Sequence, residues 1–169
     1  PDSLLQDPGF ESALGRSLKS VVRGETLPIR ETPTGWSIPA GGRAVSSPVH
    51  SGRAAAEVVN TSGGYLLWRQ ALPLGKLPVG STWRLSAWVK GEGIVRGDPS
   101  WKVGCIRFGV QTNQMQYFSC PELIGTFDWK QVSAEVTIPQ GAMGVNAEVG
   151  LNGALGKLWI DEVTLERVK

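Results

Sequence analysis

Residues 101–120 contain the densest group of side chains that could bind a ligand through polar and aromatic contacts. Arginine, glutamine and aromatic residues there alternate with apolar ones, and successive side chains of a β-strand point to opposite faces. A two-residue turn at Thr112-Asn113 would fold the segment into a hairpin with two unlike faces. We expect a core face of Ile106, Phe108, Val110, Met115 and Tyr117, and a polar binding face of Arg107, Gln111, Gln114, Gln116 and Phe118.

The same turn would place the two cysteines of the chain opposite each other. With a two-residue turn, Cys105 faces Cys120 across the hairpin. Opposed residues in antiparallel strands lie about 4.5–5.5 Å apart at Cα, which is within the range of a disulfide. We therefore predict a disulfide, which favours an extracellular protein. Two reduced thiols in a cytosolic sheet are the alternative.

The residue types argue against an enzyme. His50 is the only histidine, so a Ser-His-Asp or Cys-His catalytic group would have to be built on it alone. A glycosidase needs two carboxylates roughly 5–9 Å apart across a cleft, and Glu148 could meet Asp98 or Glu122. No His and Cys spacing suits a metal cluster, and no glycine-rich phosphate loop follows a strand.

Charge and hydropathy exclude other classes of partner. The formal net charge is +2 and no run of Lys or Arg occurs, so the positive patch of a nucleic-acid-binding protein is missing. No apolar stretch reaches the roughly 18–20 residues that cross a bilayer. We expect neither nucleic acid nor a membrane as a partner.

The elements that position these side chains are short strands. The chain has 22 Gly and 11 Pro, and 41% of its residues are hydrophobic, which suits strands joined by tight turns. We predict one monomeric all-β domain over residues 1–169, built as a two-sheet antiparallel β-sandwich. Besides the hairpin, strands are expected at Ser20–Arg23, Gly35–Ser37, Ala54–Val59, Tyr65–Leu72, Trp83–Lys90, Gln131–Ile138, Gly144–Asn152 and Leu158–Glu166.

Six motifs in order resemble the carbohydrate-binding modules of families 4, 9, 16 and 22. Each motif is weak by itself, but together they run over nearly the whole chain. The resemblance implies a jelly-roll β-sandwich that is attached to a secreted glycan-active enzyme and holds polysaccharide without cleaving it. The motifs are Leu4–Glu11, Gly35-Trp36, His50–Arg53, Trp83–Lys90, Trp129 with Val136–Pro139, and Trp159–Val163.

The resemblance also suggests ligand contacts outside the hairpin. Tyr65 resembles the stacking aromatic of family 22, which carries Trp there, and Asn146 and Glu148 resemble ligand-contacting positions. Sugars pack C–H faces on aromatic rings and hydrogen-bond their hydroxyls to amides and charged groups. Trp101 is a candidate second platform. Trp88 is either a stacking ring or a ring covered by a loop, and the glutamines are either a binding face or an ordinary solvated one.

Modules of these families commonly carry a structural calcium where the first and last strands meet. By motif, Glu11 and Asp161 would supply carboxylates, with backbone carbonyls near Ser51 and Arg53 completing the shell. Calcium takes about six to eight oxygen ligands of these kinds. The alternative is a turn cap at Glu11 and an edge-strand charge at Asp161.

These observations predict a secreted, non-catalytic module that binds polysaccharide or oligosaccharide of the xylan or β-glucan type. Its other partner would be the catalytic domain of a larger enzyme. The alternatives are an adhesion or structural spacer module without sugar binding and, less favoured, a glycosidase or lyase domain.

Overall fold

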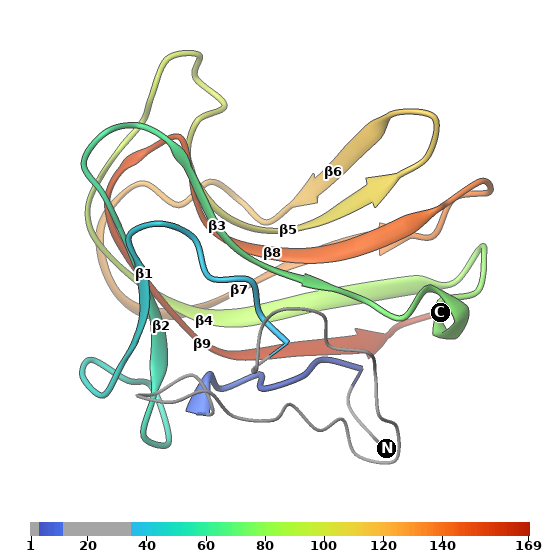
Figure 1. Ribbon diagram of the computed structural model, residues 1–169, viewed down its shortest axis with the longest axis horizontal. Helices are drawn as coiled ribbons and strands as arrows, with labels where there is room; N and C mark the ends of the chain where they lie inside the picture. The colour runs from blue at the N-terminus through green and yellow to red at the C-terminus, as the bar shows by residue number, and fades with distance from the viewer. Residues whose placement is uncertain (1–3, 12–34) are drawn as a thin grey trace.

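The computed structural model describes residues 4–11 and 35–169, which form two antiparallel sheets that face each other (Figure 1). One sheet has five strands in the order β1-β2-β9-β4-β7, and the other has four in the order β3-β8-β5-β6. A short 3-10 turn, η2, spans Leu74–Lys76. The strands are β1 Gly42–Val45, β2 Ala55–Asn60, β3 Tyr65–Ala71, β4 Thr82–Val95, β5 Gly104–Gln111, β6 Met115–Ser119, β7 Gly125–Thr137, β8 Gly144–Asn152 and β9 Leu155–Arg167.

The predicted all-β sandwich is confirmed, and alternation located its clearest strands. β8 begins and ends where the pattern predicts, while β4, β7 and β9 extend several residues further. The inward residues of β8 are all at most 1% exposed, because they pack between the sheets. These residues are Val145, Ala147, Val149 and Leu151.

The strands predicted for the first third of the chain agree less closely with the structure. Of Gly35–Ser37, only Ser37 pairs, through an isolated bridge to Arg69. β1 is absent from the predicted strands, and the strand expected at Ser20–Arg23 lies outside the described residues. Among residues 4–11 and 35–169, no helix has the length and apolarity needed to cross a membrane.

The N-terminal segment closes the core at one end of the sandwich. Phe10 is fully buried and its ring centroid lies 5.1 Å from Trp36 and 5.2 Å from Trp68. Gln6 exchanges hydrogen bonds with Gln70 of β3, at 2.7 and 2.9 Å. Burial of such large rings is a main source of stability, so this segment is part of the core.

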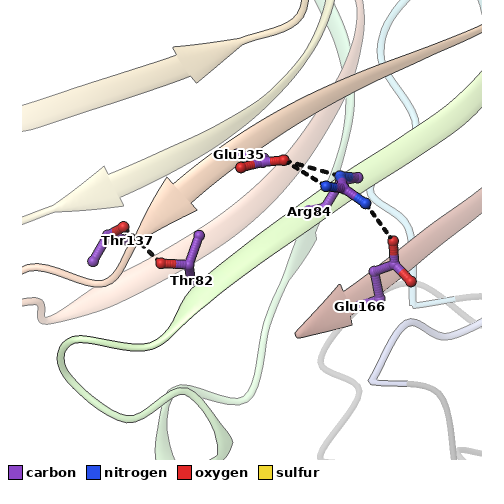
Figure 2. A network of polar contacts seen from close by, with 5 residues as sticks. All are labelled: Thr82, Arg84, Glu135, Thr137 and Glu166. Atoms are coloured by element: carbon purple, nitrogen blue, oxygen red, sulfur yellow. Dashed lines mark hydrogen bonds and ion pairs between the residues drawn. The ribbon is translucent and has the colours of Figure 1, made fainter. Parts of the chain in front are cut away.

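Charged side chains on the outer face of the five-stranded sheet form ion pairs with one another. Arg84 of β4 donates to Glu135 of β7 and to Glu166 of β9, and Thr82 bonds Thr137 beside them (Figure 2). Such exposed cross-strand pairs contribute little stability. These five side chains therefore use their polar groups on one another.

The register of the central hairpin differs from the predicted one by one residue. Phe108 pairs with Phe118 and Gln111 with Met115, so the turn has three residues, 112–114. Thr112 holds it by accepting and donating hydrogen bonds with Gln114. A one-residue shift moves every side chain of a strand to its other face, and it therefore exchanges the two predicted faces of β6.

Candidate functional site

Three charged side chains lie opposite one another on neighbouring strands of the four-stranded sheet. Arg69 of β3 and Arg107 of β5 are both register partners of Glu148 of β8. Oε2 of Glu148 accepts a hydrogen bond from Nε of Arg69 and Oε1 accepts one from Nε of Arg107, each at 2.8 Å. Glu148 is 2% exposed, whereas the Arg69 side chain is 51% exposed. A buried charge must be paired, and Glu148 is paired with a half-exposed Arg69 and with Arg107, whose side chain is 9% exposed.

A cleft of about 510 Å³ lies over this charged group. Three of its aromatic side chains are about half exposed, at 58% for Tyr65, 52% for Trp101 and 49% for Tyr117. Exposed large apolar groups gathered in one place mark binding surfaces, and clefts of this size hold small ligands. The lining residues are Tyr65, Leu67, Arg69, Trp101, Arg107, Tyr117 and Asn152.

The aromatic rings are held next to positive charge. Tyr65 and Trp101 are nearly parallel, with centroids 6.2 Å apart and an interplanar angle of 9°. Nζ of Lys102 lies 5.7 Å from the Tyr65 centroid and 5.9 Å from the Trp101 centroid. A cation near a ring face is attracted to it. The exposed ring surface remains able to pack against a flat apolar face of a ligand.

Two glycines lie in the sheet beneath the cleft, one on β8 and one on β5. Gly150 of β8 pairs with Cys105 of β5, between the Tyr65 end and the charged group. A Cβ atom on Gly109 would lie 3.2 Å from Oε2 of Glu148 and 3.4 Å from Cε of Met115. A Cβ atom on Gly150 would overlap the carbonyl oxygen of Leu66, so both glycines permit close packing of their neighbours beneath the cleft.

Four predicted ligand residues come together at this cleft. Tyr65, Trp101 and Arg107 line it, and Glu148 lies beneath it. Asn146 lies on the same face of β8 as Glu148 but does not line the cleft.

The predicted glutamines lie elsewhere. Gln111 ends β5 and its Nε2 donates to the carbonyl oxygen of Thr112 at 2.9 Å. Gln114 lies in the exposed turn. Gln116 pairs with Val110, which belongs to the core face of β5, so its predicted place on the binding face is wrong.

Two predicted aromatic contacts are also placed wrongly. Phe118 pairs with Phe108 and packs against the core, because of the register shift. Trp88 lies on β4 in the other sheet, where its ring stacks on His50 at 4.0 Å. His50 covers this ring, as the alternative interpretation of Trp88 anticipated, and its Nδ1 pairs with Glu162.

The sequence interpretation missed Tyr117, Arg69 and Asn152 as cleft residues. Tyr117 was assigned to the core by the wrong register. Arg69 could have been found, because Tyr65, Leu67 and Arg69 alternate along one strand and therefore share a face. Asn152 lies four residues after Glu148 on β8, so the same alternation places both side chains on one face of the sheet.

The two cysteines are free, so the predicted disulfide is not formed. In the observed register, Cys120 donates its backbone N–H to Ile106 rather than facing Cys105. Cys105 is 2% exposed and Cys120 is 6% exposed. Burial raises the pKa of Cys105 to about 12 and raises that of Cys120 as well, because a thiolate is costly in an apolar environment.

The two carboxylates predicted to bind calcium lie near one another. A Cβ atom on Gly9 would lie 3.7 Å from Oε1 of Glu11 and 3.8 Å from Oδ1 of Asp161. One loop donates backbone N–H groups to both: Arg53 to Glu11 at 2.9 and 3.0 Å, and Ser51 to Asp161 at 3.1 Å. The N–H groups of Ser51 and Arg53 thus face the carboxylates, while a role for their carbonyls stays a prediction.

The donor chemistry of this place suits a hard cation. Asp161 is fully buried, and burial raises its pKa against the opposing effect of its backbone hydrogen bonds. Among the residues the structure describes, the cation that pairs with Glu11 is Arg53, whose Nε lies 3.9 Å from Oε2 of Glu11. Two nearby carboxylate groups fit calcium, which prefers oxygen ligands. Within residues 4–11 and 35–169, however, no group of three or more His, Cys, Asp or Glu gathers at one place.

Solved carbohydrate-binding modules have the same architecture. The C-terminal family 22 module of Clostridium thermocellum Xyn10B is 15% identical over 98% of this chain and 92% of its own, with a TM-score of 0.66. The CBM22-2 xylan-binding domain of Paenibacillus barcinonensis Xyn10C is 15% identical over 98% of this chain and 100% of its own, with a TM-score of 0.63. The CBM22-1-GH10 modules of the Clostridium thermocellum xylanase, complexed with xylohexaose, match 80% of this chain and 26% of theirs at 17% identity, with a TM-score of 0.56.

At these identities the likeness concerns the fold. No protein-family model matches the chain, and no curated protein matches its sequence. The resemblance carried by the six motifs is confirmed as a resemblance of fold. The chain has the jelly-roll β-sandwich architecture of family 22 carbohydrate-binding modules.

Proposed function

We propose that this chain is a carbohydrate-binding module that holds a β-linked polysaccharide in the cleft of the four-stranded sheet. The observation that carries the proposal is the pair of half-exposed, parallel rings of Tyr65 and Trp101 beside the guanidinium of Arg69. Pyranose rings pack their C–H faces on aromatic rings and direct their hydroxyls to polar side chains at the edge. The shared fold of sugar-binding modules supports the same function.

The proposed ligand is a polysaccharide of the xylan or β-glucan type. An open cleft on a sheet, rather than a closed pocket, suits a chain whose ends extend beyond the site. The family 22 structures described as xylan-binding, or complexed with xylohexaose, support xylan as the first candidate.

Binding without cleavage follows from the charges in the cleft. A glycosidase uses two carboxylates on opposite sides of the scissile bond. Both oxygens of Glu148 accept hydrogen bonds from arginines, and no other carboxylate lines the cleft among the described residues. Glu122, a predicted partner, instead pairs with Arg96.

The module would serve a larger, secreted glycan-active enzyme by keeping it on its substrate. The solved chain that joins a family 22 module to a GH10 module supports this arrangement. Both cysteines are free, so a disulfide does not support secretion. We propose secretion because plant polysaccharides lie outside cells. A structural spacer is the competing function, and it requires no half-exposed rings above a charged group.

A structural calcium between Glu11 and Asp161 completes the proposal. Its charge would offset the two carboxylates and join the N-terminal segment to β9. Gly52 is suited to this loop because its φ is +64° and a Cβ atom there would overlap Oε1 of Glu11.

Affinity gel electrophoresis tests the function. The panel is xylan, mixed-linkage β-glucan, β-1,3-glucan and mannan, with an inert protein as the mobility reference. We expect retardation by at least one polymer and no release of smaller sugars from any. Unchanged mobility in every gel would favour the spacer, and sugar release would contradict the non-catalytic function.

A further inference from the structure

The cleft carries more positive charge than its buried carboxylate neutralises. Arg69 and Arg107 both pair with Glu148, which leaves this group one positive charge in excess. Lys102 adds a second, since its Nζ lies within 6 Å of both the Tyr65 and Trp101 centroids and no described carboxylate pairs with it. A concave site lined by one sign of charge concentrates ligands of the opposite sign.

Hydrogen-bond donors also outnumber acceptors in the cleft. Each guanidinium carries five N–H donors and no acceptor, and the hydrogen bonds to Glu148 use only the Nε group of each arginine. The remaining N–H groups of Arg69 and Arg107 make no hydrogen bond to the residues the structure describes. Glu148 provides no free acceptor to a ligand, because it is buried and both of its oxygens already accept hydrogen bonds from arginines.

A neutral sugar would use only part of the hydrogen-bonding capacity of this cleft. Its hydroxyls both donate and accept, and they pair well with amides. Only one amide, Asn152, lines the described cleft, because the predicted glutamines lie at the hairpin turn or on its other face. A carboxylate only accepts, and guanidiniums bind it through two parallel N–H groups.

We infer that the ligand is an acidic polysaccharide whose sugar carboxylates pair with Arg69, while Tyr65 and Trp101 pack against its pyranose rings; Arg107, whose side chain is 9% exposed, balances Glu148 beneath them. The inference rests on the proposed function and specifies its ligand class as uronate-bearing glycans. Holding Glu148 needs only one of the two arginines for charge balance. The half-exposed Arg69, with its free N–H groups at the cleft surface, is therefore the principal contact to the carboxylate.

The test compares glucuronoxylan and polymannuronate, both with β-linked backbones, with the same polymers after carbodiimide activation and borohydride reduction, which converts each carboxylate to a hydroxymethyl group. Affinity electrophoresis and calorimetry measure binding. For at least one pair we expect about tenfold weaker binding after reduction. Binding of the native polymer should weaken with added NaCl, while binding of the reduced one should not.

Matched variants separate the cleft from general surface charge. Arg69→Gln removes one cleft cation and leaves Arg107 to balance Glu148, and Lys102→Gln removes another. Lys157→Gln removes an exposed cation from β9 in the other sheet. The ratio of native to reduced affinity should decrease with both cleft variants and stay unchanged with Lys157→Gln.

The outcomes distinguish this inference from the function on which it rests. Equal affinity for native and reduced polymers would overturn the acidic ligand and leave a neutral-glycan module. Equal effects of Lys102→Gln and Lys157→Gln would also overturn it, because binding would then follow net charge. Failure to bind any acidic, reduced or neutral polysaccharide would overturn the proposed function itself.

Discussion

The guanidinium carbon of Arg107 lies 3.9 Å from the centroid of the Tyr117 ring. Tyr117 of β6 is the register partner of Gly109, two residues along β5 from Arg107. Because Gly109 has no side chain, the ring can lie diagonally over Arg107, a contact that long side chains on adjacent strands can reach. This contact and the bond to Glu148 fix the orientation of Arg107.

Two aromatic substitutions should separate binding from stability. Tyr65→Ala removes a half-exposed cleft ring, so polysaccharide affinity should fall by roughly tenfold or more with little change in unfolding. Phe118→Ala removes a ring that packs against the core. It should lower the free energy of unfolding by roughly 2 kcal/mol, below the cost for a fully buried Phe, and keep the affinity.

Affinity electrophoresis and urea unfolding measure the two effects. Weakened binding by a stably folded Phe118→Ala would contradict the observed hairpin register. Full retention by Tyr65→Ala would contradict the cleft as the binding site.

Glu148→Gln should destabilise the protein. The buried carboxylate balances two arginines, and removing one partner of a buried ion pair typically costs about 3–5 kcal/mol. Since Arg69 is half exposed, we expect about 3 kcal/mol by urea unfolding. Glu135→Gln is the control, because it disrupts the exposed pair with Arg84 on the other sheet (Figure 2). Equal unfolding midpoints for the two variants would argue against a structural role of Glu148.

Calcium should raise the melting temperature, and EDTA should lower it. A ligand at 100 times its Kd stabilises the folded state by about 2.7 kcal/mol, which shifts Tm by roughly 5–10 °C in a domain of this size. Asp161→Asn should abolish the calcium response. Asp128→Asn, at an exposed site paired with Lys90, should keep it. A melting curve of the unaltered protein that is the same in calcium and in EDTA would remove the metal from the proposal.

Both thiols should react slowly in the folded protein. Burial disfavours the charged thiolate and raises the pKa of Cys105 from 9.0 to about 12, so little thiolate exists near neutral pH. Iodoacetamide should label neither cysteine in the native state and both after unreduced denaturation, as read by mass spectrometry. If neither cysteine were labelled after denaturation without reductant, the protein would instead contain the disulfide.

The raised pKa of Cys105 also determines how stability changes with pH in the alkaline range. Between pH 9.0 and about 12 the folded state keeps the Cys105 proton that the unfolded state loses. Unfolding then releases a proton, so this group should lower stability as pH rises through that window. Urea unfolding of Cys105→Ser against the unaltered protein measures this contribution, and identical pH profiles would contradict it.

Local pattern determined much of this protein. Alternation placed β8 at its exact residues and predicted the inward faces of β4 and β8, because a half-buried strand requires apolar residues at every second position. The order of motifs indicated the sandwich, whereas the expectation of short strands is wrong for β4, β7 and β9, which have 14, 13 and 13 residues. Tyr65, Trp101, Arg107 and Glu148 were all named from the sequence, and all four meet at one cleft.

Tertiary structure alone decided which faces meet. One extra residue in the turn at 112–114 moved Tyr117 into the cleft and Phe118 into the core, since the period of a strand is two residues and a shift of one reverses every side chain. The pairing of Arg69 with Glu148 joins residues 79 positions apart, which no local pattern reveals. Sequence therefore specified which side chains were available for binding, and strand register and sheet order specified which of them form the site.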